Sequence, residues 1–167
     1  SRYQDDIEQL EDPAGLTPVR GSAVQVTLVD AEPDVIEAAL AEDPETDRND
    51  YVVHQQDIQA VVNALWLGGA RAMTLMGQRI VSTTGIKCVG NTVIIKNIPY
   101  SPPYVIEAVG DPDELEEAVY SNPRVAAYLA DASVLDLGWS LDTEDELELP
   151  AYTGSAELRY AEAVIDR

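Results

Sequence analysis

Between His54 and Tyr104 the spacing of apolar residues changes from a helical period to a strand period, and this constrains the fold more than any other feature. Asp57 is a candidate N-terminal cap, and Gly68 with Gly69 supplies a stop signal. The apolar residues between them follow the i, i+3, i+4, i+7, i+8 spacing of an amphipathic helix: Ile58, Val61, Val62, Leu65 and Trp66. The spacing predicts a helix that begins near Asp57 and ends before Gly68.

Short apolar runs after this helix predict antiparallel strands. The expected strands are 71–76, 79–81, 86–89, 92–95 and 105–109. Gly77-Gln78 and Gly90-Asn91 are the expected turns, and Gly followed by Asn is a two-residue hairpin signal. The segment YSPPY at 100–104 resembles a polyproline recognition peptide, but flanking strands favour a rigid corner.

The flanking segments complete an α+β pattern. Alternating Val24, Val26 and Leu28 predict a first strand. Residues 32–50 form an acidic excursion with at most a short helix at 34–41. Asp111-Pro112 and Asn122-Pro123 are helix starts. Expected strands at 139–141 and 147–149 are separated by an acidic turn, 142–146, with a possible last strand at 157–160.

This order of elements predicts a ferredoxin-like split β-α-β sheet with an inserted β-hairpin and helices on one face. The 167 residues, 46% of them hydrophobic, suffice for one globular domain, assigned to residues 16–167. Residues 1–15 contain Tyr3, Ile7 and Leu10 at coiled-coil spacing. They are either the end of a helical stalk, which would pair with another copy, or a terminal helix packed on the domain.

Charge is distributed unevenly along the chain. Residues 51–104 carry four cations, Arg71, Arg79, Lys87 and Lys96, against one acid, Asp57. This segment therefore has a net charge of +3. The rest of the chain has a net charge of −24, and the two together give the chain's net charge of −21. Strands with little room for charge and an interaction surface both explain the contrast. The acidic balance excludes binding to a nucleic acid backbone, which requires Lys and Arg.

Polar and basic residues gather around the expected hairpin. An anion-binding or interaction patch is predicted here, and ordinary polar residues at strand ends are the alternative. The patch comprises Arg79, Ser82, Thr83, Lys87, Asn91 and Lys96.

The residues that most often carry chemistry do not form a recognisable set. Alternate positions from 43 to 49 hold residues of the kind that bind calcium in a loop: Asp43, Glu45, Asp47 and Asn49. However, Arg48 stands where such a loop requires Gly, and His54 stands where it requires Glu. A solvated loop is therefore favoured. A nucleophilic pair of Cys88 and His54 is disfavoured because the thiol lies in an apolar strand. We predict no catalytic, cofactor or metal residue, and expect a protein that is not an enzyme.

Several motifs stand out between about Leu16 and Tyr160: DIQAVVNALW, MGQR, ST-x-x-I-x-C-x-GNT, YSPPY and A-x-GD. Together they resemble the extracytoplasmic domain of the YlxW/YlxX-like family of Gram-positive bacteria, a domain-of-unknown-function family. Met76 stands where the family often has Asn. The acidic stretch 32–50 is a further departure, so no role is carried over to that loop.

The resemblance implies one N-terminal membrane anchor, a coiled-coil stalk and this domain outside the membrane. No run of 18 apolar residues occurs, and the chain opens at Ser1 without methionine, so we expect the anchor to lie upstream. Family members sit beside cell-division and envelope genes. The expected function is a non-catalytic scaffold or interaction domain with envelope or division proteins as partners. A small anionic envelope ligand is the alternative, and no cofactor is expected.

Overall fold

The two longest strands, β1 (Val19–Val29) and β8 (Gly138–Leu149), pair antiparallel in a five-stranded sheet. The computed structural model describes residues 17–89 and 92–152. The other strands of this sheet are β2 (Ala72–Leu75), β3 (Gln78–Ile80) and β7 (Tyr104–Val109). The strand order is β3-β2-β7-β1-β8, and all neighbours are antiparallel. The turn between β2 and β3 is at Met76-Gly77, one residue before the predicted position, and both residues have positive φ.

A second sheet consists of β4 (Ile86–Val89), β5 (Thr92–Ile95) and β6 (Ile98–Tyr100) in sequential antiparallel order. The predicted bounds of β4 and β5 are confirmed. Strand β6 was not predicted, because its turn at Lys96-Asn97 lacks glycine. Both turn residues nevertheless have positive φ, 52° and 65°, as a two-residue hairpin turn of this kind requires. Residues 101–103 join β6 to β7, as predicted for a corner, with a cis Pro102–Pro103 bond.

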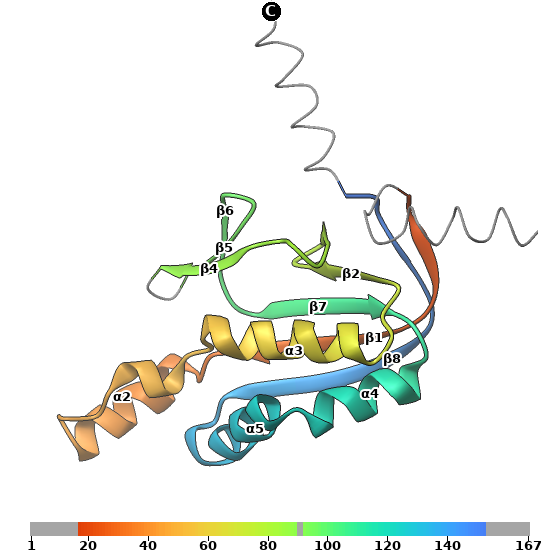
Figure 1. Cartoon of the computed structure of the whole chain (residues 1–167). Helices are drawn as coiled ribbons and strands as arrows, with labels where there is room; N and C mark the ends of the chain where they lie inside the picture. Colours follow the sequence, from red (N-terminus) through yellow and green to blue (C-terminus); the bar gives the residue numbers. More distant parts are fainter. Residues whose placement is uncertain (1–16, 90–91, 153–167) are drawn as a thin grey trace, which may run out of the picture.

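Three helices cover one face of the five-stranded sheet (Figure 1), as predicted: α3 (Gln55–Leu67), α4 (Pro112–Ser121) and α5 (Pro123–Leu135). Helix α3 begins two residues before Asp57, whose carboxylate accepts a hydrogen bond from the His54 backbone N–H at 2.9 Å. The predicted helix starts at Asp111 and Asn122 are confirmed, and each of these side chains accepts two backbone hydrogen bonds as the N-terminal cap. None of the described helices is long and apolar enough to cross a membrane.

The acidic excursion contains α2 (Pro33–Glu42) and the 3₁₀ helix η2 (Arg48–Tyr51), neither of which buries a residue completely. This agrees with the predicted exposed segment and short helix. Helix α2 extends away from the sheet at the end where β1 stops (Figure 1). The predicted stalk at 1–15 and the possible strand at 157–160 lie outside the described residues.

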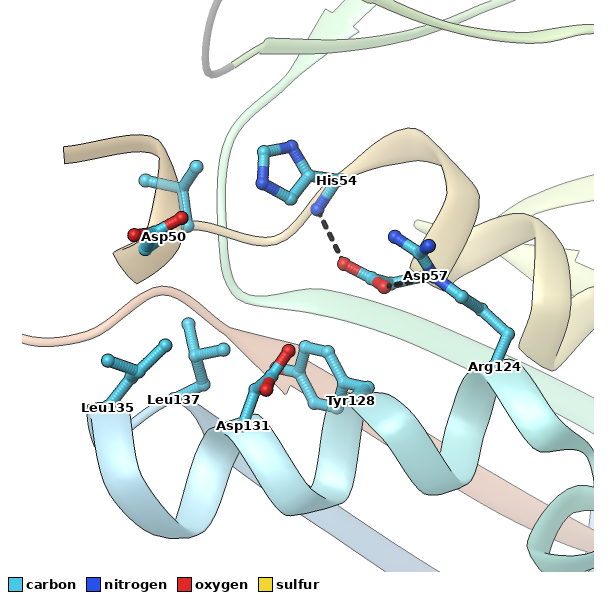
Figure 2. A pocket seen from close by; sticks show the side chains of 9 residues that line it. Asp50, His54, Asp57, Arg124, Tyr128, Asp131, Leu135 and Leu137 are labelled. Carbon is cyan, nitrogen blue, oxygen red and sulfur yellow. Dashed lines mark hydrogen bonds and ion pairs between the residues drawn. The ribbon is translucent and has the colours of Figure 1, made fainter. Parts of the chain in front are cut away.

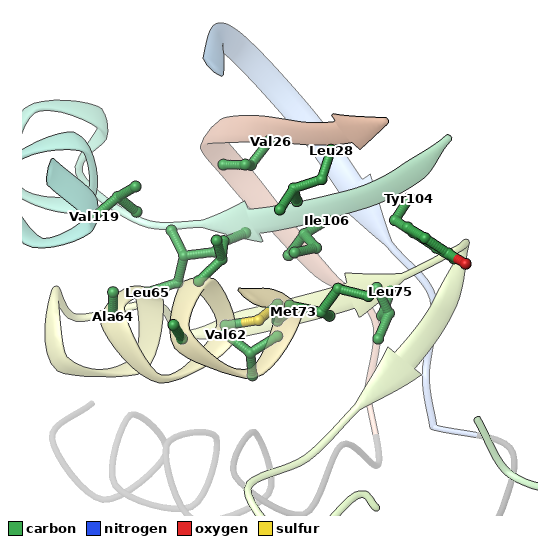
Figure 3. Close-up of a cluster of buried hydrophobic side chains, with 14 of the residues drawn as sticks. Val26, Leu28, Val62, Ala64, Leu65, Met73, Leu75, Tyr104, Ile106 and Val119 are labelled. Atoms are coloured by element: carbon green, nitrogen blue, oxygen red, sulfur yellow. The ribbon is translucent and has the colours of Figure 1, made fainter. Parts of the chain in front are cut away.

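The main core lies between α3 and the sheet (Figure 3). Because side chains alternate along a strand, Val26, Leu28 and Ile106 point toward the helices. Leu65 meets them from α3, and every one of these side chains is fully buried. The second sheet contributes to the same core through Ile86, Val93 and Ile95. The hairpin is therefore anchored by one face, and its other face is directed away from the core.

The prediction of two strands separated by an acidic turn at 142–146 was wrong. The chain continues as one strand, β8, and pairs with β1 through Gln25–Asp142 and Ala23–Glu144. Strand β8 lies at the sheet edge, where acidic side chains reach solvent and discourage pairing with other edges. The acidic residues are thus solvated, as expected, but on a strand.

Candidate functional sites

Arg79 does not belong to the predicted surface patch, because it is 2% exposed. It pairs with Thr74 across β2 and β3, and both point to the sheet face opposite the helices. Its Nη1 atom donates to the Thr17 carbonyl at 2.9 Å and the Pro150 carbonyl at 3.0 Å. Arg79 therefore connects the segments that enter β1 and leave β8.

The rest of the predicted patch is divided. Lys87 and Thr83 line a cleft of about 230 Å³ together with Lys96. We call it the lysine cleft, and its full lining is Thr83, Thr84, Gly85, Lys87, Ile94, Lys96, Asn97 and Tyr152. Ser82 is exposed but does not line the cleft, and Asn91 lies outside the described residues.

Two lysines give the lysine cleft its charge. Lys87 is exposed on β4, whereas Lys96 is half-buried with Nζ 4.0 Å from the centre of the Tyr152 ring. A cation at this distance from an aromatic face is attracted by the ring's electrons. The Thr84 hydroxyl accepts a hydrogen bond from the Val81 N–H and so helps to shape the adjoining turn. The cleft thus combines one fixed and one accessible cation.

The cleft continues into the outward face of the second sheet. We call this surface the hairpin face, and it consists of Lys87, Val89, Thr92, Ile94 and Pro99, which share a face by strand register and alternation. Val89 is 65% exposed, and Lys87 and Pro99 are also exposed. The chain contains no acid between Ser82 and Tyr104. The hairpin face is therefore a basic and apolar surface on an acidic protein.

Sequence reasoning missed the apolar members of this surface. The predicted strands already placed Val89 and Ile94 on the same side as Lys87, so alternation along the hairpin contained the signal. Tyr152 gave no such signal, since it reaches Lys96 across 56 residues of chain.

A second hollow, which was not predicted, lies between η2, the start of α3 and α5 (Figure 2). We call it the acidic pocket. It measures about 320 Å³ and is lined by Asp50, Val52, His54, Asp57, Arg124, Tyr128, Asp131, Leu135 and Leu137. These residues come from segments up to 87 positions apart, so no local pattern could reveal them.

Asp57 and Arg124 form an ion pair at one wall of the acidic pocket. The Asp57 side chain is 7% exposed, and its Oδ1 atom is 3.1 Å from Arg124 Nε. Its other oxygen accepts the His54 backbone N–H. Arg124 remains half-exposed, at 51% of its side chain. The buried carboxylate is therefore fully engaged, and its charge is balanced within the pocket wall.

His54 and Tyr128 have defined hydrogen-bonding roles in the same pocket. His54 Nε2 lies 2.7 Å from the Asn49 carbonyl, and since a carbonyl only accepts, Nε2 carries the proton. Tyr128 is buried, and its hydroxyl donates to the Gly138 carbonyl at 2.8 Å. Burial, followed by the nearby Asp57 charge, raises the pKa of Tyr128 well above its ordinary value, so the hydroxyl remains a donor.

The pair of Cys88 and His54 considered from the sequence does not share a pocket. His54 lines the acidic pocket, whereas Cys88 lies on β4 and does not line it. Among the described residues, no group of three or more His, Cys, Asp or Glu side chains is arranged to hold a metal ion.

A family model described as "Bacterial protein of unknown function (DUF881)" matches residues 6–162, nearly the whole chain. The protein belongs to this family. Its resemblance to YlxW-like proteins is thereby confirmed. The protein is 36% identical over 112 residues to the UPF0749 protein YlxW of Bacillus subtilis, covering 66% of this chain and 45% of that protein.

Two further comparisons, both with Mycobacterium tuberculosis, concern sequence and fold. UPF0749 protein Rv1823 is 29% identical over 140 residues, which cover 83% of this chain and 45% of that relative. The chain thus spans about half the length of the curated relatives it matches. The crystal structure of an uncharacterized conserved protein from Mycobacterium tuberculosis superposes on this chain with a TM-score of 0.66 at 20% sequence identity. The match covers 88% of this chain and 91% of that one. This likeness establishes a shared fold.

Proposed function

We propose that this member of the family is a non-catalytic interaction domain that binds an acidic partner through the hairpin face and the lysine cleft. The observation that carries the proposal is the exposed combination of Lys87 and Val89 on a chain of net charge −21. Elsewhere the acidic surface repels an acidic partner, so association is electrostatically most favourable at this face.

The composition of the hairpin face also supports a protein partner. Interfaces combine exposed apolar residues with charges at their rim, and here Val89 and Pro99 are accompanied by Lys87. The hairpin is anchored to the core by Ile86, Val93 and Ile95. Its outer face therefore keeps its conformation before a partner binds. The surface is therefore preorganised, which reduces the entropy lost on binding.

A small anionic ligand is the alternative occupant of the lysine cleft. Two cations beside the Thr83 hydroxyl favour it. The volume of about 230 Å³ argues against it, because small-molecule pockets usually measure about 300–1,000 Å³. A carboxylate carried by a protein partner fits a cleft of this size better, since the rest of the partner lies on the hairpin face.

The setting of the domain is part of the same proposal. We propose, from the family resemblance of its sequence motifs, that the domain lies outside the membrane, with an upstream anchor and stalk and with envelope or division proteins as partners. Under this proposal the stalk pairs two copies. We also propose that β2, β7, β1 and β8, with α3 to α5 on one face, constitute a ferredoxin-like split β-α-β unit. Their order along the chain and in the sheet supports it.

Site-specific photo-crosslinking in cells tests this function. A photoreactive residue at Val89 of the full-length protein should yield a discrete crosslinked species, identified by mass spectrometry. Leu67 is the matched control, because it is apolar and 86% exposed but lies at the end of α3. Equal products from the two positions, or none from Val89, would rule out the hairpin face as the binding surface.

A further inference from the structure

The acidic pocket has a charge opposite to that of the lysine cleft. Its ionised lining comprises Asp50, Asp57, Asp131 and Arg124, which gives −2 with His54 neutral. Arg124 compensates Asp57 through their ion pair. The excess charge therefore resides on Asp50 and Asp131.

Asp50 and Asp131 have no hydrogen-bond or ion-pair partner for their carboxylates among the described residues. They come from different elements, η2 and α5, and face the same hollow (Figure 2). Two like charges that converge on one space repel each other, and a cation between them relieves the repulsion. The pocket is thus electrostatically suited to a positive group.

The remaining lining is apolar. Val52 and Leu137 are buried, Leu135 is half-buried, and the ring of Tyr128 lies beside them. An inorganic cation would gain nothing from these side chains. An aliphatic stem that carries a cationic head would gain from both, because Lys and Arg bury their stems along apolar surface and direct their charge to polar groups.

We infer that the acidic pocket binds the ammonium or guanidinium group of a basic side chain from a partner polypeptide. The head lies between Asp50 and Asp131, and the stem lies against Leu135 and Leu137. The volume of about 320 Å³ is at the lower end of ligand pockets, which suits one side chain better than a large cofactor. The chain's net negative charge favours the approach of basic segments.

Nuclear magnetic resonance titration of the protein tests this inference independently of the hairpin face. The probes are n-butylammonium, the peptide acetyl-Gly-Lys-Gly-amide and, as a neutral isostere, 1-butanol. We expect the peptide and n-butylammonium to cause saturable shifts of the His54 ring and the Asp131 amide. Butanol should not. Equal shifts with butanol would overturn the role of charge, and binding of n-butylammonium without the peptide would overturn the polypeptide source.

Matched variants identify the carboxylate involved. Asp131→Asn should weaken binding of the peptide by about fivefold, the upper range for an exposed ion pair. Asp142→Asn removes the same charge from exposed β8 and should change affinity less than about twofold through the general field. Both substitutions are at exposed sites, so the fold is retained. Equal effects of the two variants would overturn the assignment of the pocket.

Discussion

Replacement of Arg79 by methionine should destabilise the domain, because this guanidinium is buried and joins two distant chain segments. The hydrogen bonds from Nη1 to the carbonyls of Thr17 and Pro150 are charge-assisted. Such bonds contribute roughly 1.5–3 kcal/mol each. Thr17 is half-buried and Pro150 exposed, so both carbonyls regain water in the variant. We therefore expect a net loss of about 2–4 kcal/mol in the free energy of unfolding.

Urea unfolding followed by circular dichroism measures this loss, and Arg71→Met is the matched control. Arg71 also donates to a backbone carbonyl, that of Arg20 at 3.2 Å, but it is exposed. Its replacement should change stability by less than about 0.5 kcal/mol. Arg79→Lys should give an intermediate value, because an ammonium lacks the planar fork of guanidinium. Equal losses for Arg79→Met and Arg71→Met would refute the role assigned to the buried guanidinium.

Two further predictions concern stability. Burial raises the pKa of the Asp30 carboxyl above 3.8, despite the hydrogen bond from the Val53 N–H, so ionised Asp30 opposes folding. In urea unfolding, the free energy of unfolding of Asp30→Asn should rise relative to that of the wild type as the pH increases from about 3 to 6. Below the pKa of Asp30 in the unfolded chain the variant should show no such gain. A difference between the two proteins that stays constant with pH would contradict this prediction. A Cβ at Gly68 would lie 2.8 Å from that of Ala118, whereas one at Gly85 meets nothing within 4 Å. Gly68→Ala should therefore lower the melting temperature and reduce the free energy of unfolding by about 1–3 kcal/mol, whereas the control Gly85→Ala should not. Equal melting temperatures for the two variants would show that α3 and α4 accommodate the methyl group.

Local signals in the sequence predicted the elements whose residues lie close together in the chain. Helix α3 and the pair β4–β5 followed from apolar spacing and from turn residues. Strand β8 was misinterpreted because its acidic middle resembles a turn. Its continuity depends on pairing with β1, more than 100 residues earlier. Pairing between strands so far apart in the chain is determined by the tertiary structure. The acidic residues of an edge strand give no apolar alternation that would reveal the pairing in the sequence.

The candidate sites divide in the same way. Lys87 was placed correctly on an exposed hairpin because a strand's alternation is local. Arg79 was misplaced because its burial depends on carbonyls 62 and 71 positions away. The acidic pocket was missed because Asp50 and Asp131 come from η2 and α5, which line one hollow only in the folded domain. Charge counting along the chain identified a basic segment but not which cations reach solvent.

Charge reversal combined with crosslinking tests most directly whether the hairpin face binds an acidic partner. The photoreactive residue at Val89 is retained while Lys87→Glu or Arg48→Glu is introduced into the full-length protein. Both cations are exposed, and both substitutions change the net charge equally. Lys87→Glu should reduce the crosslinked yield severalfold, and Arg48→Glu should leave it nearly unchanged. Equal yields from the two variants would contradict a partner bound at this face through its charge.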